Sequence, residues 1–586
     1  MSHIFSREWF EMRDLRRRRF ENAGWIPLRA GETINPIGQY GRPGSSEELF
    51  CAGCIAVPKA KQTEAERLGW MDIGLSNLGG PHAFSDGSYK ACEIYQYRDG
   101  EDLGISLVFE QHVVGDHPKI WHINQDLILA LRLVQEGDSW VRPEENFVEV
   151  IRQRRDSSNQ VTAIEIRTEF LRDYLAARGM ALRLSYYRQR MAVLNEMPQF
   201  GWPKDGLIEE RPHDRFNARL FEIDETGGPY GASVGIFHAW RTDIDPEEDV
   251  PIFGREDNTN TQGRSVTYNR GGTKYFRAEG ELWREEWIEP GQRSERVRRD
   301  EPLEAAYFTI DASGNRASSK DLNNEDIGRY LWFDPKLIVN LLGRRGSGIK
   351  WHTRYTGSIW CSPDSPIHFG VNRLGMINVY AYDVARQDPW QQKIWAGFNI
   401  TPDGAVSAEL LESQMRAQPA GTAAPEKELP HLMDELDTQF EERYGNALFK
   451  SHQATPEILR NIHRFRAVEN HGLLALSKDI ARLIADRIDI AALHKIAAPP
   501  KGEKWGSLKS LEKVLATRHP AEQARSILTP LVGVYELRLG DAHLPSSTIT
   551  EAMAMVGVRA DASPVAQGLQ LIDAVVGALT RVKETA

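Results

Sequence analysis

One stretch of the sequence indicates how this chain is divided: Gln418-Pro-Ala-Gly-Thr-Ala-Ala-Pro-Glu-Lys-Glu-Leu-Pro430. Large apolar side chains nearly vanish there, and small, polar and proline residues replace them, which is the composition of a linker. Before it, short apolar runs typical of strands mix with helical patterns, whereas after it apolar residues recur with a helical period. We therefore predict an α+β multidomain protein, with a large mixed α/β N-terminal region followed by an all-α helical bundle.

The bundle is expected over residues 431–586. Thr455-Pro456 and Ser563-Pro564 both predict helix starts, because a hydroxyl can cap the first turn and proline suits the first helical position. Two further helix-periodic segments are Leu508–Leu515 and Ile527–Leu539. Together with the patterns between them, these segments predict about five or six helices packed as a bundle.

Upstream of the linker, the length favours two domains, a mixed α/β domain over residues 1–200 and a β-rich one over residues 201–417. In the first domain we expect three helices and a glycine- and proline-rich loop: Arg7–Asn22, Gln125–Gln135 and Thr168–Gly179, and the loop Gly31–Gly44. The third of these helices should end at its glycine and bury one face, formed by Phe170, Leu171, Tyr174 and Leu175. In the second domain, Lys336–Leu342 predicts a helix and residues 253–273 an exposed polar loop.

The formal net charge of the chain is −11. A protein that coats duplex nucleic acid is usually basic, since neutralising phosphates supplies most of its affinity. Nucleic acid would therefore have to be engaged at local basic patches or at a dimer cleft. No apolar run approaches the roughly 18 residues of a membrane span, so no membrane contact is expected. Four cysteines make no disulfide framework in a chain of this length, which favours a reducing cytoplasm.

The most distinctive local motif is Tyr535-Glu-Leu-Arg-Leu-Gly-Asp-Ala-His-Leu-Pro545. Pro545 disfavours helical geometry at the residue before it, so a helix should end at about His543. Gly540 loosens the last turn and lets the side chains of Arg538 and His543 converge. An imidazole at this end of a helix is favoured in its protonated form by the helix dipole.

An arginine followed five positions later by a histidine, in a helical C-terminal domain, resembles the active-site motif of the HEPN ribonucleases. Those are helical bundles of bacterial toxins, abortive-infection systems and CRISPR effectors. The resemblance implies a homodimer whose arginines and histidines meet in a cleft and cut RNA without metal or cofactor, using the 2′-hydroxyl of the RNA as nucleophile. It assigns transition-state stabilisation to Arg538 and proton transfer to His543. That family commonly has asparagine directly after the arginine, where this chain has Leu539, and Asp541 is expected to orient the arginine instead.

Alternatives to this pair remain. Two other arginine–histidine pairs have the same or a looser spacing, Arg466 with His471 and Arg487 with His494. In a further alternative, Arg538 forms an ion pair with Glu536 or Asp541 on a solvated helix face. His543 would then be only a helix cap.

A second candidate surface begins at the glycine-rich turn Gly343-Arg-Arg-Gly-Ser-Gly348. A phosphate-binding P-loop needs lysine directly after its second glycine, and the intervening Ile349 excludes a nucleotide hydrolase of that class. Basic and aromatic side chains nevertheless alternate here, which suits single-stranded nucleic acid or a nucleotide. The residues expected to bind it are Arg344, Arg345, Lys350, Trp351 and Arg354. The alternative is an ordinary basic turn.

No metal site is predicted. Cys51-Ala-Gly-Cys54 has the spacing of half a zinc site, which His82 and Cys92 could complete, but small buried thiols are the more common use of such residues. A second group of possible ligands has irregular spacing: His112, Asp116, His117 and His122.

Segments within Trp121–Arg190 and Asp388–Asn399 resemble parts of large uncharacterised bacterial proteins. This likeness implies one extended family with no assigned activity. We expect the N-terminal region to sense or bind a trigger, either a protein or a nucleotide.

The sequence thus predicts a defence effector of antiphage or abortive-infection type with a metal-independent endoribonuclease domain. The alternative is a non-catalytic binding or scaffold protein whose bundle dimerises or docks a partner. A DNA-acting enzyme is a weaker third class, because the N-terminal region has no convincing carboxylate–lysine constellation.

Overall fold

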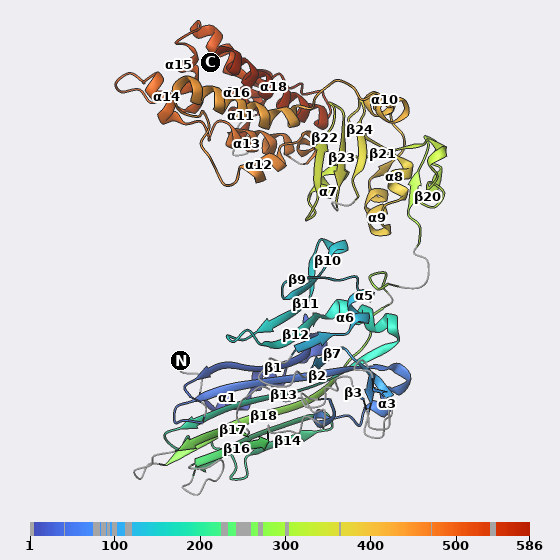
Figure 1. Cartoon of the computed structure of the whole chain (residues 1–586), viewed down its shortest axis with the longest axis vertical. Helices are drawn as coiled ribbons and strands as arrows, with labels where there is room; N and C mark the ends of the chain where they lie inside the picture. Colours follow the sequence, from blue (N-terminus) through green and yellow to red (C-terminus); the bar gives the residue numbers. More distant parts are fainter. Residues whose placement is uncertain are drawn as a thin grey trace. The chain divides into compact units, whose positions relative to one another are not determined.

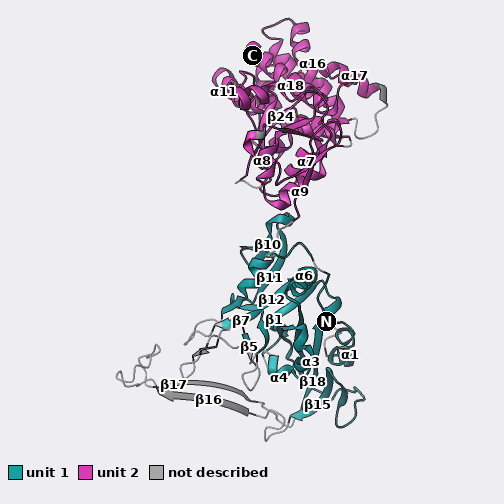
Figure 2. Ribbon diagram, turned by 90° about the vertical axis from the view of Figure 1, so that its right-hand side faces the viewer, with its two compact units in different colours: residues 1–302 teal, residues 303–586 magenta. Residues whose placement is uncertain are grey.

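The computed structural model describes residues 5–39, 41–73, 82–83, 89–90, 94–96, 102–111, 120–223, 233–241, 259–267, 274–292, 294–298, 304–361, 365–469, 471–539 and 546–586. The chain divides into two compact units, residues 1–302 and residues 303–586 (Figure 2). The first unit is built largely of strands, and the second combines a smaller sheet with many helices (Figure 1). This confirms the α+β multidomain class.

Short helices accompany the strands of the first unit. The helices are α1 (Arg7–Glu11), α2 (Arg13–Arg16), η1 (Phe20–Asn22), η2 (Lys59–Lys61), α3 (Gln62–Ala65), α4 (Trp70–Ile73), α5 (Gln125–Ala130), η4 (Pro143–Glu145) and α6 (Thr168–Arg178). The strands are β1 (Trp25–Ile37), β2 (Ser46–Pro58), β3 (His82–Ala83), β4 (Tyr89–Lys90), β5 (Ile94–Gln96), β6 (Asp102–Ser106), β7 (Val108–Gln111), β8 (Ile120–Ile123), β9 (Val134–Glu136), β10 (Ser139–Arg142), β11 (Val148–Arg155), β12 (Val161–Arg167), β13 (Met180–Leu194), β14 (Leu207–Arg211), β15 (Asp214–Ile223), β16 (Ser233–Arg241), β17 (Thr259–Thr267) and β18 (Tyr275–Ile288).

A 12-stranded antiparallel sheet organises the first unit, in the order β14-β15-β18-β13-β2-β1-β12-β11-β10-β9, with β6 and β5 branching from β2. The long strand β13 pairs with β2 along one edge and with β18 along the other. Strands β14, β15 and β18 follow residue 201 in the chain but complete the same sheet as β13. This pairing explains why the first unit continues to residue 302 and does not end at the predicted boundary.

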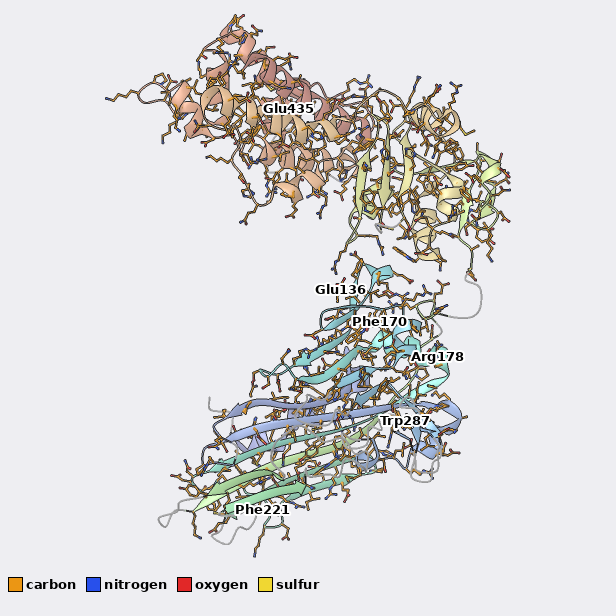
Figure 3. All side chains as sticks on the ribbon, viewed as in Figure 1. Glu136, Phe170, Arg178, Phe221, Trp287 and Glu435 are labelled. Atoms are coloured by element: carbon orange, nitrogen blue, oxygen red, sulfur yellow. The ribbon has the colours of Figure 1, made fainter. Side chains whose placement is uncertain are left out.

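Helix α6 connects β12 to β13 and covers one face of the sheet. The predicted buried face is confirmed, because Phe170, Leu171, Tyr174 and Leu175 are all buried. The helix ends at Gly179, whose φ of 63° is a left-handed conformation that suits glycine. Phe170 and Arg178 mark the first and last turns of this helix in Figure 3.

Four local predictions in the first unit are wrong in whole or in part. The predicted helix Arg7–Asn22 is interrupted at Met12, whose φ is 47°. The first half of the predicted loop Gly31–Gly44 is strand, because β1 runs to Ile37 and pairs with β2. The predicted helix Gln125–Gln135 ends at Ala130, and the chain turns into β9 after Arg132, whose φ is 55°. Part of the predicted loop 253–273 is strand β17, paired with β16, and the rest lies outside the described residues.

The second unit contains a smaller sheet and a helical bundle. Its strands are β19 (Tyr307–Thr309), β20 (Arg316–Ser318), β21 (Tyr330–Phe333), β22 (Gly348–Trp351), β23 (Thr356–Trp360), β24 (Ile367–Val371), β25 (Ile377–Tyr380) and β26 (Asn399–Ile400). Its helices are η6 (Glu325–Ile327), α7 (Lys336–Leu342), α8 (Ala381–Ala385), α9 (Pro389–Gly397), α10 (Ala408–Arg416), α11 (Pro425–Tyr444), α12 (Thr455–Asn461), η7 (Arg464–Val468), α13 (Gly472–Leu483), α14 (Ile490–Ile496), α15 (Ser507–Leu515), α16 (Ala521–Leu539), α17 (Ser546–Val556) and α18 (Pro564–Thr585). Six strands form one antiparallel sheet, in the order β22-β23-β24-β25-β21-β26.

The predicted linker 418–430 lies inside the second unit and does not separate two bodies. Helix α11 already begins at Pro425, with Leu429 in the core of the bundle. Ahead of that helix, the Thr422 hydroxyl donates to Glu409 at 2.8 Å and accepts from the Arg354 amide at 3.1 Å. The segment looks like a linker in sequence because its contacts are polar and its apolar side chains are small.

A buried ion pair joins the start of α11 to η7. The Arg464 guanidinium donates to both oxygens of Glu426, each at 2.7 Å, and the two side chains are 0% and 3% exposed. The same guanidinium donates to the Arg354 carbonyl at 2.9 Å and lies 4.1 Å from the ring centroid of Trp351, at the end of β22. The small sheet and the helical bundle are therefore held as one folded body.

Helix α18 is the central helix of the bundle. Among the described helices it is the one long and apolar enough to cross a membrane by length and composition alone, with half of that window buried. A core helix passes the same test, and α18 packs against α11, α13 and α16. Glu435 on α11, labelled in Figure 3, pairs with Lys583 on α18 at 3.0 Å. The Ser563 hydroxyl caps the first turn of α18, which confirms the helix start predicted at Ser563-Pro564.

Breaking the Arg464–Glu426 pair should destabilise the second unit strongly. We expect Glu426→Gln to lower the free energy of unfolding by about 3–5 kcal/mol, because it leaves a buried guanidinium without its counter-charge. Urea unfolding of the full chain, followed by circular dichroism, measures the change. Glu412→Gln is the matched control, since the exposed Arg416–Glu412 pair should contribute about 0.5 kcal/mol or less. Equal effects of the two substitutions would contradict this account.

The same pair predicts a loss of stability in acid. Burial raises the pKa of Glu426, but the charge and hydrogen bonds of Arg464 outweigh it and lower the pKa below the ordinary 4.5. A carboxyl whose pKa is lower in the folded state stabilises the fold fully above the unfolded pKa, and that contribution is lost as the pH falls further. The wild type should therefore lose stability below pH 4.5 more steeply than Glu426→Gln. Parallel pH profiles of the urea midpoint would contradict it.

Candidate functional site

The candidate site in the bundle is built around Arg538, in the last turn of α16. Its guanidinium donates from Nη1 to both oxygens of Asp486, each at 2.7 Å. It also lies 5.5 Å from the ring centroid of Tyr535, one turn earlier on the same helix. The Arg538 side chain is 28% exposed, so solvent and a ligand can reach it.

Asp486 is the partner that sequence reasoning missed. It follows α13 and lies 52 residues before Arg538 in the chain. Only the packing of α13 against α16 brings the two residues together. The alternative considered from the sequence was an ion pair of Arg538 with Glu536 or Asp541. No local signal identifies Asp486, because a single acidic residue after a helix is common on protein surfaces.

The other two residues of the predicted catalytic set, Asp541 and His543, lie outside the described residues, which end at Leu539 and resume at Ser546. The helices on either side of this segment pack closely. A Cβ atom on Gly533 of α16 would lie 2.7 Å from Val556 and 2.8 Å from Met555 of α17. The structure shows where the side chain of Arg538 lies. That this side chain converges with His543 stays a prediction.

Apolar side chains are exposed beside Arg538. Val532, Tyr535 and Leu539 are 37%, 37% and 43% exposed, and their spacing puts them along one side of α16. Met555 on α17 is 44% exposed. A hollow of about 510 Å³ extends over part of this surface. It is lined by residues of α15, α16 and α17, including Lys509, Arg525, Val532, Tyr535 and Met555. We call the four exposed apolar residues the apolar stripe.

The alternative arginine–histidine pairs serve local structure. Arg466 forms an ion pair with Glu469, and His471 precedes α13 with a φ of 56°. Arg487 donates to the Lys450 carbonyl at 2.8 Å. His494 lies 3.0 Å from the hydroxyl of Ser510.

The predicted nucleic-acid surface at residues 344–354 is wrong at Trp351, because this side chain is buried. This indole is 6% exposed and stacks at 5.8 Å on Phe465, while the Arg464 guanidinium covers it, so it offers no face to a base. Arg354 is engaged as well, because it donates to Asp573 of α18 at 3.0 Å. The Arg344 guanidinium lies 4.9 Å from the ring centroid of Trp390. Arg345 and Lys350 are exposed. The alternation of basic and aromatic residues here reflects packing between the sheet and the bundle.

The paired cysteines do not form half of a zinc site. Both lie on β2, three positions apart, and side chains at odd spacing on a strand point to opposite faces of the sheet. Burial raises the pKa of Cys51 to about 11 and raises the pKa of Cys54 further, while the Cys54 thiol donates to the Leu28 carbonyl at 3.2 Å. In the part of the chain that the structure describes, no group of three or more possible ligands could hold a metal ion. The side chains of His82 and Cys92, and the residues His112, Asp116 and His117, are outside that part.

Comparisons with protein-family models, with curated proteins and with solved structures found no match to this chain. The assignment of a function therefore rests on the geometry of the chain and on the motif at Arg538.

The buried thiols predict slow alkylation. In the native protein at pH 8, we expect Cys51 and Cys54 to resist iodoacetamide, because burial keeps them as unreactive thiols. Both should be labelled once guanidinium chloride unfolds the chain. Peptide mapping by mass spectrometry reads each site. Rapid native labelling that zinc prevents would show instead that these cysteines are exposed metal ligands.

Proposed function

We propose that this chain is a defence effector whose helical bundle cleaves RNA without a metal ion, as a homodimer, with Arg538 and His543 as the catalytic residues. The observation that carries the proposal is the placement of Arg538. Its guanidinium is accessible and is held at a helix end by Asp486, directly before the segment that contains His543.

Asp486 gives Arg538 the orienting contact that was expected of Asp541. Both of its hydrogen bonds reach Nη1, so the rest of the guanidinium lies outside this contact. Arginine carries five N–H donors in a planar fork that matches the oxygens of a phosphate. An arginine fixed in this way can stabilise the negative charge that develops on phosphoryl oxygens in the transition state.

The proposed reaction is an attack by the 2′-hydroxyl of the RNA on the adjacent phosphorus. The bond from O2′ to phosphorus forms, and the bond from phosphorus to the 5′-oxygen breaks. A neutral imidazole accepts the proton of the 2′-hydroxyl, and a protonated imidazole gives one to the leaving 5′-oxygen. A dimer provides two copies of His543, one for each role.

The apolar stripe supports the dimer. Val532, Tyr535, Leu539 and Met555 form an exposed apolar surface next to the Arg538 guanidinium. Exposed apolar patches on a folded protein commonly mark surfaces that bind other proteins. A second copy of the chain that covers this stripe would bring the two Arg538 side chains near one interface. In the alternative function, a non-catalytic scaffold, the same stripe docks a partner protein.

Loss of either catalytic residue should abolish cleavage. With total RNA in EDTA, we expect Arg538→Ala and His543→Ala each to reduce cleavage about a hundredfold or more, because each removes one part of transition-state stabilisation or proton transfer. Gel electrophoresis of the RNA measures the rate. Arg466→Ala and His471→Ala are the matched controls and should keep the wild-type rate. Cleavage that survives both test substitutions, or that requires a divalent metal, would contradict the assignment.

Charge within the apolar stripe should weaken self-association. We expect Tyr535→Glu to raise the dissociation constant of the dimer by at least about tenfold, because it places a carboxylate in an apolar interface. Sedimentation velocity over a range of protein concentrations measures this constant. Met415→Glu is the control, since Met415 on α10 is also exposed, at 63%, but lies outside the stripe. A wild-type chain that stays monomeric at all concentrations would rule out the dimer.

A further inference from the structure

A pocket lined with arginines lies in the first unit, in the part where Figure 2 labels α1, β15 and β18. Its volume is about 370 Å³. The lining residues come from three separate segments of the chain: Arg13, Arg16 and Arg17; Glu209, Arg211, Asp214 and Phe216; and Arg284. Five arginines thus line the pocket with only two carboxylates, in a chain whose formal net charge is negative.

Arg284 fixes the shape of this pocket from beneath. Its side chain is 2% exposed and donates to the carbonyl of Arg16 at 2.8 Å and to the carbonyl of Arg18 at 3.0 Å. It also donates to Asp214 at 2.8 Å and to the Tyr186 hydroxyl at 3.1 Å. A strand of the main sheet therefore holds the end of α2 in place, and Arg284 is a positioning residue.

Both carboxylates of the pocket are already engaged. Glu209 pairs with Arg16, whose guanidinium lies 4.1 Å from the ring centroid of Phe216. Asp214 pairs with Arg284 at 2.8 Å and with Arg19 at 3.3 Å. The negative charges of the lining are thus neutralised by ion pairs with Arg16, Arg19 and Arg284.

Three arginines remain at its rim. Arg13 is 61% exposed and pairs with Glu11. Arg17 and Arg211 are exposed, and neither forms an ion pair with a carboxylate of the described part of the chain. Arg17 follows α2, and Arg211 ends β14 at the turn into β15. Two free guanidinium groups beside three others repel each other unless an anion lies between them.

The chemistry of the lining selects a phosphate chain. Guanidinium groups bind phosphate oxygens in a bidentate manner, and several of them around one cavity favour a ligand with several charges. The one aromatic ring, Phe216, is 1% exposed beneath Arg16, so it offers no face on which a base could stack. The volume lies at the lower end of the range for small-molecule sites.

We propose that this pocket binds a chain of phosphates, such as inorganic tripolyphosphate or the triphosphate of a nucleotide, through Arg17 and Arg211. Free polyphosphate and a nucleoside triphosphate share the chemistry that the pocket recognises. The binding does not depend on RNA cleavage by the helical bundle.

Isothermal titration calorimetry of the full chain tests this proposal, with tripolyphosphate, ATP and a short single-stranded RNA as separate ligands. We expect the double substitution Arg17→Ala with Arg211→Ala to weaken tripolyphosphate binding about a hundredfold, about tenfold for each lost charged contact. The double substitution Arg18→Ala with Arg215→Ala is the matched control. It removes the same charge from neighbouring exposed arginines that do not line the pocket, and it should keep binding within about twofold of the wild type.

The outcomes are distinct. Binding of tripolyphosphate that is lost in the test variant and kept in the control supports the proposal. Tighter binding of ATP than of tripolyphosphate identifies a nucleotide as the source of the phosphates. No binding by the wild type, or equal binding by both double variants, overturns the proposal. Arginine-dependent binding of the RNA without binding of tripolyphosphate also overturns it. Arg538→Ala should bind tripolyphosphate normally, which separates this result from the fate of the proposed RNA cleavage.

Discussion

The ion pair between Arg464 and Glu426 is the interaction on which the second unit depends. Removing two charges from water costs several kcal/mol for each ion, so such a pair persists only where its geometry and remaining hydrogen bonds are satisfied. Here Arg464 binds both oxygens of Glu426, donates to the Arg354 carbonyl and covers Trp351. One guanidinium thereby joins the first turn of α11, the segment before α13 and the small sheet. The helical bundle is part of a larger body and is not a free-standing domain.

Local patterns predicted a substantial part of the fold. Helix α6 with its buried face, helix α7 and the start of α18 follow from apolar spacing, capping residues and glycine or proline at helix ends. The errors fall where distant segments decide the structure. Strand β1 continues into the glycine- and proline-rich stretch as far as Ile37 because β2 pairs with it. The predicted linker is fixed by Glu409 and Arg464. Composition cannot show these partners.

The candidate site was predictable only in part, for the same reason. The motif indicated Arg538, but its partner Asp486 lies in the turn after α13, 52 residues away in the chain. The exposure of Tyr535 and Leu539 depends on how the helices around α16 pack. The arginine pocket of the first unit shows the same limit. The basic run that contains Arg17 is visible in the sequence, whereas its approach to Arg211 and Arg284 depends on the order of strands in the sheet.

The chemistry of the cut RNA ends tests the proposed mechanism most directly. If the 2′-hydroxyl attacks phosphorus and His543 moves the protons, cleavage in EDTA leaves a 2′,3′-cyclic phosphate, or the 3′-phosphate from its hydrolysis, on one fragment and a 5′-hydroxyl on the other. End labelling and mass spectrometry of the fragments distinguish these termini. The proposal predicts 5′-hydroxyl ends that disappear in Arg538→Ala and in His543→Ala. Fragments with 5′-phosphate and 3′-hydroxyl ends would contradict it, because those ends require attack by water.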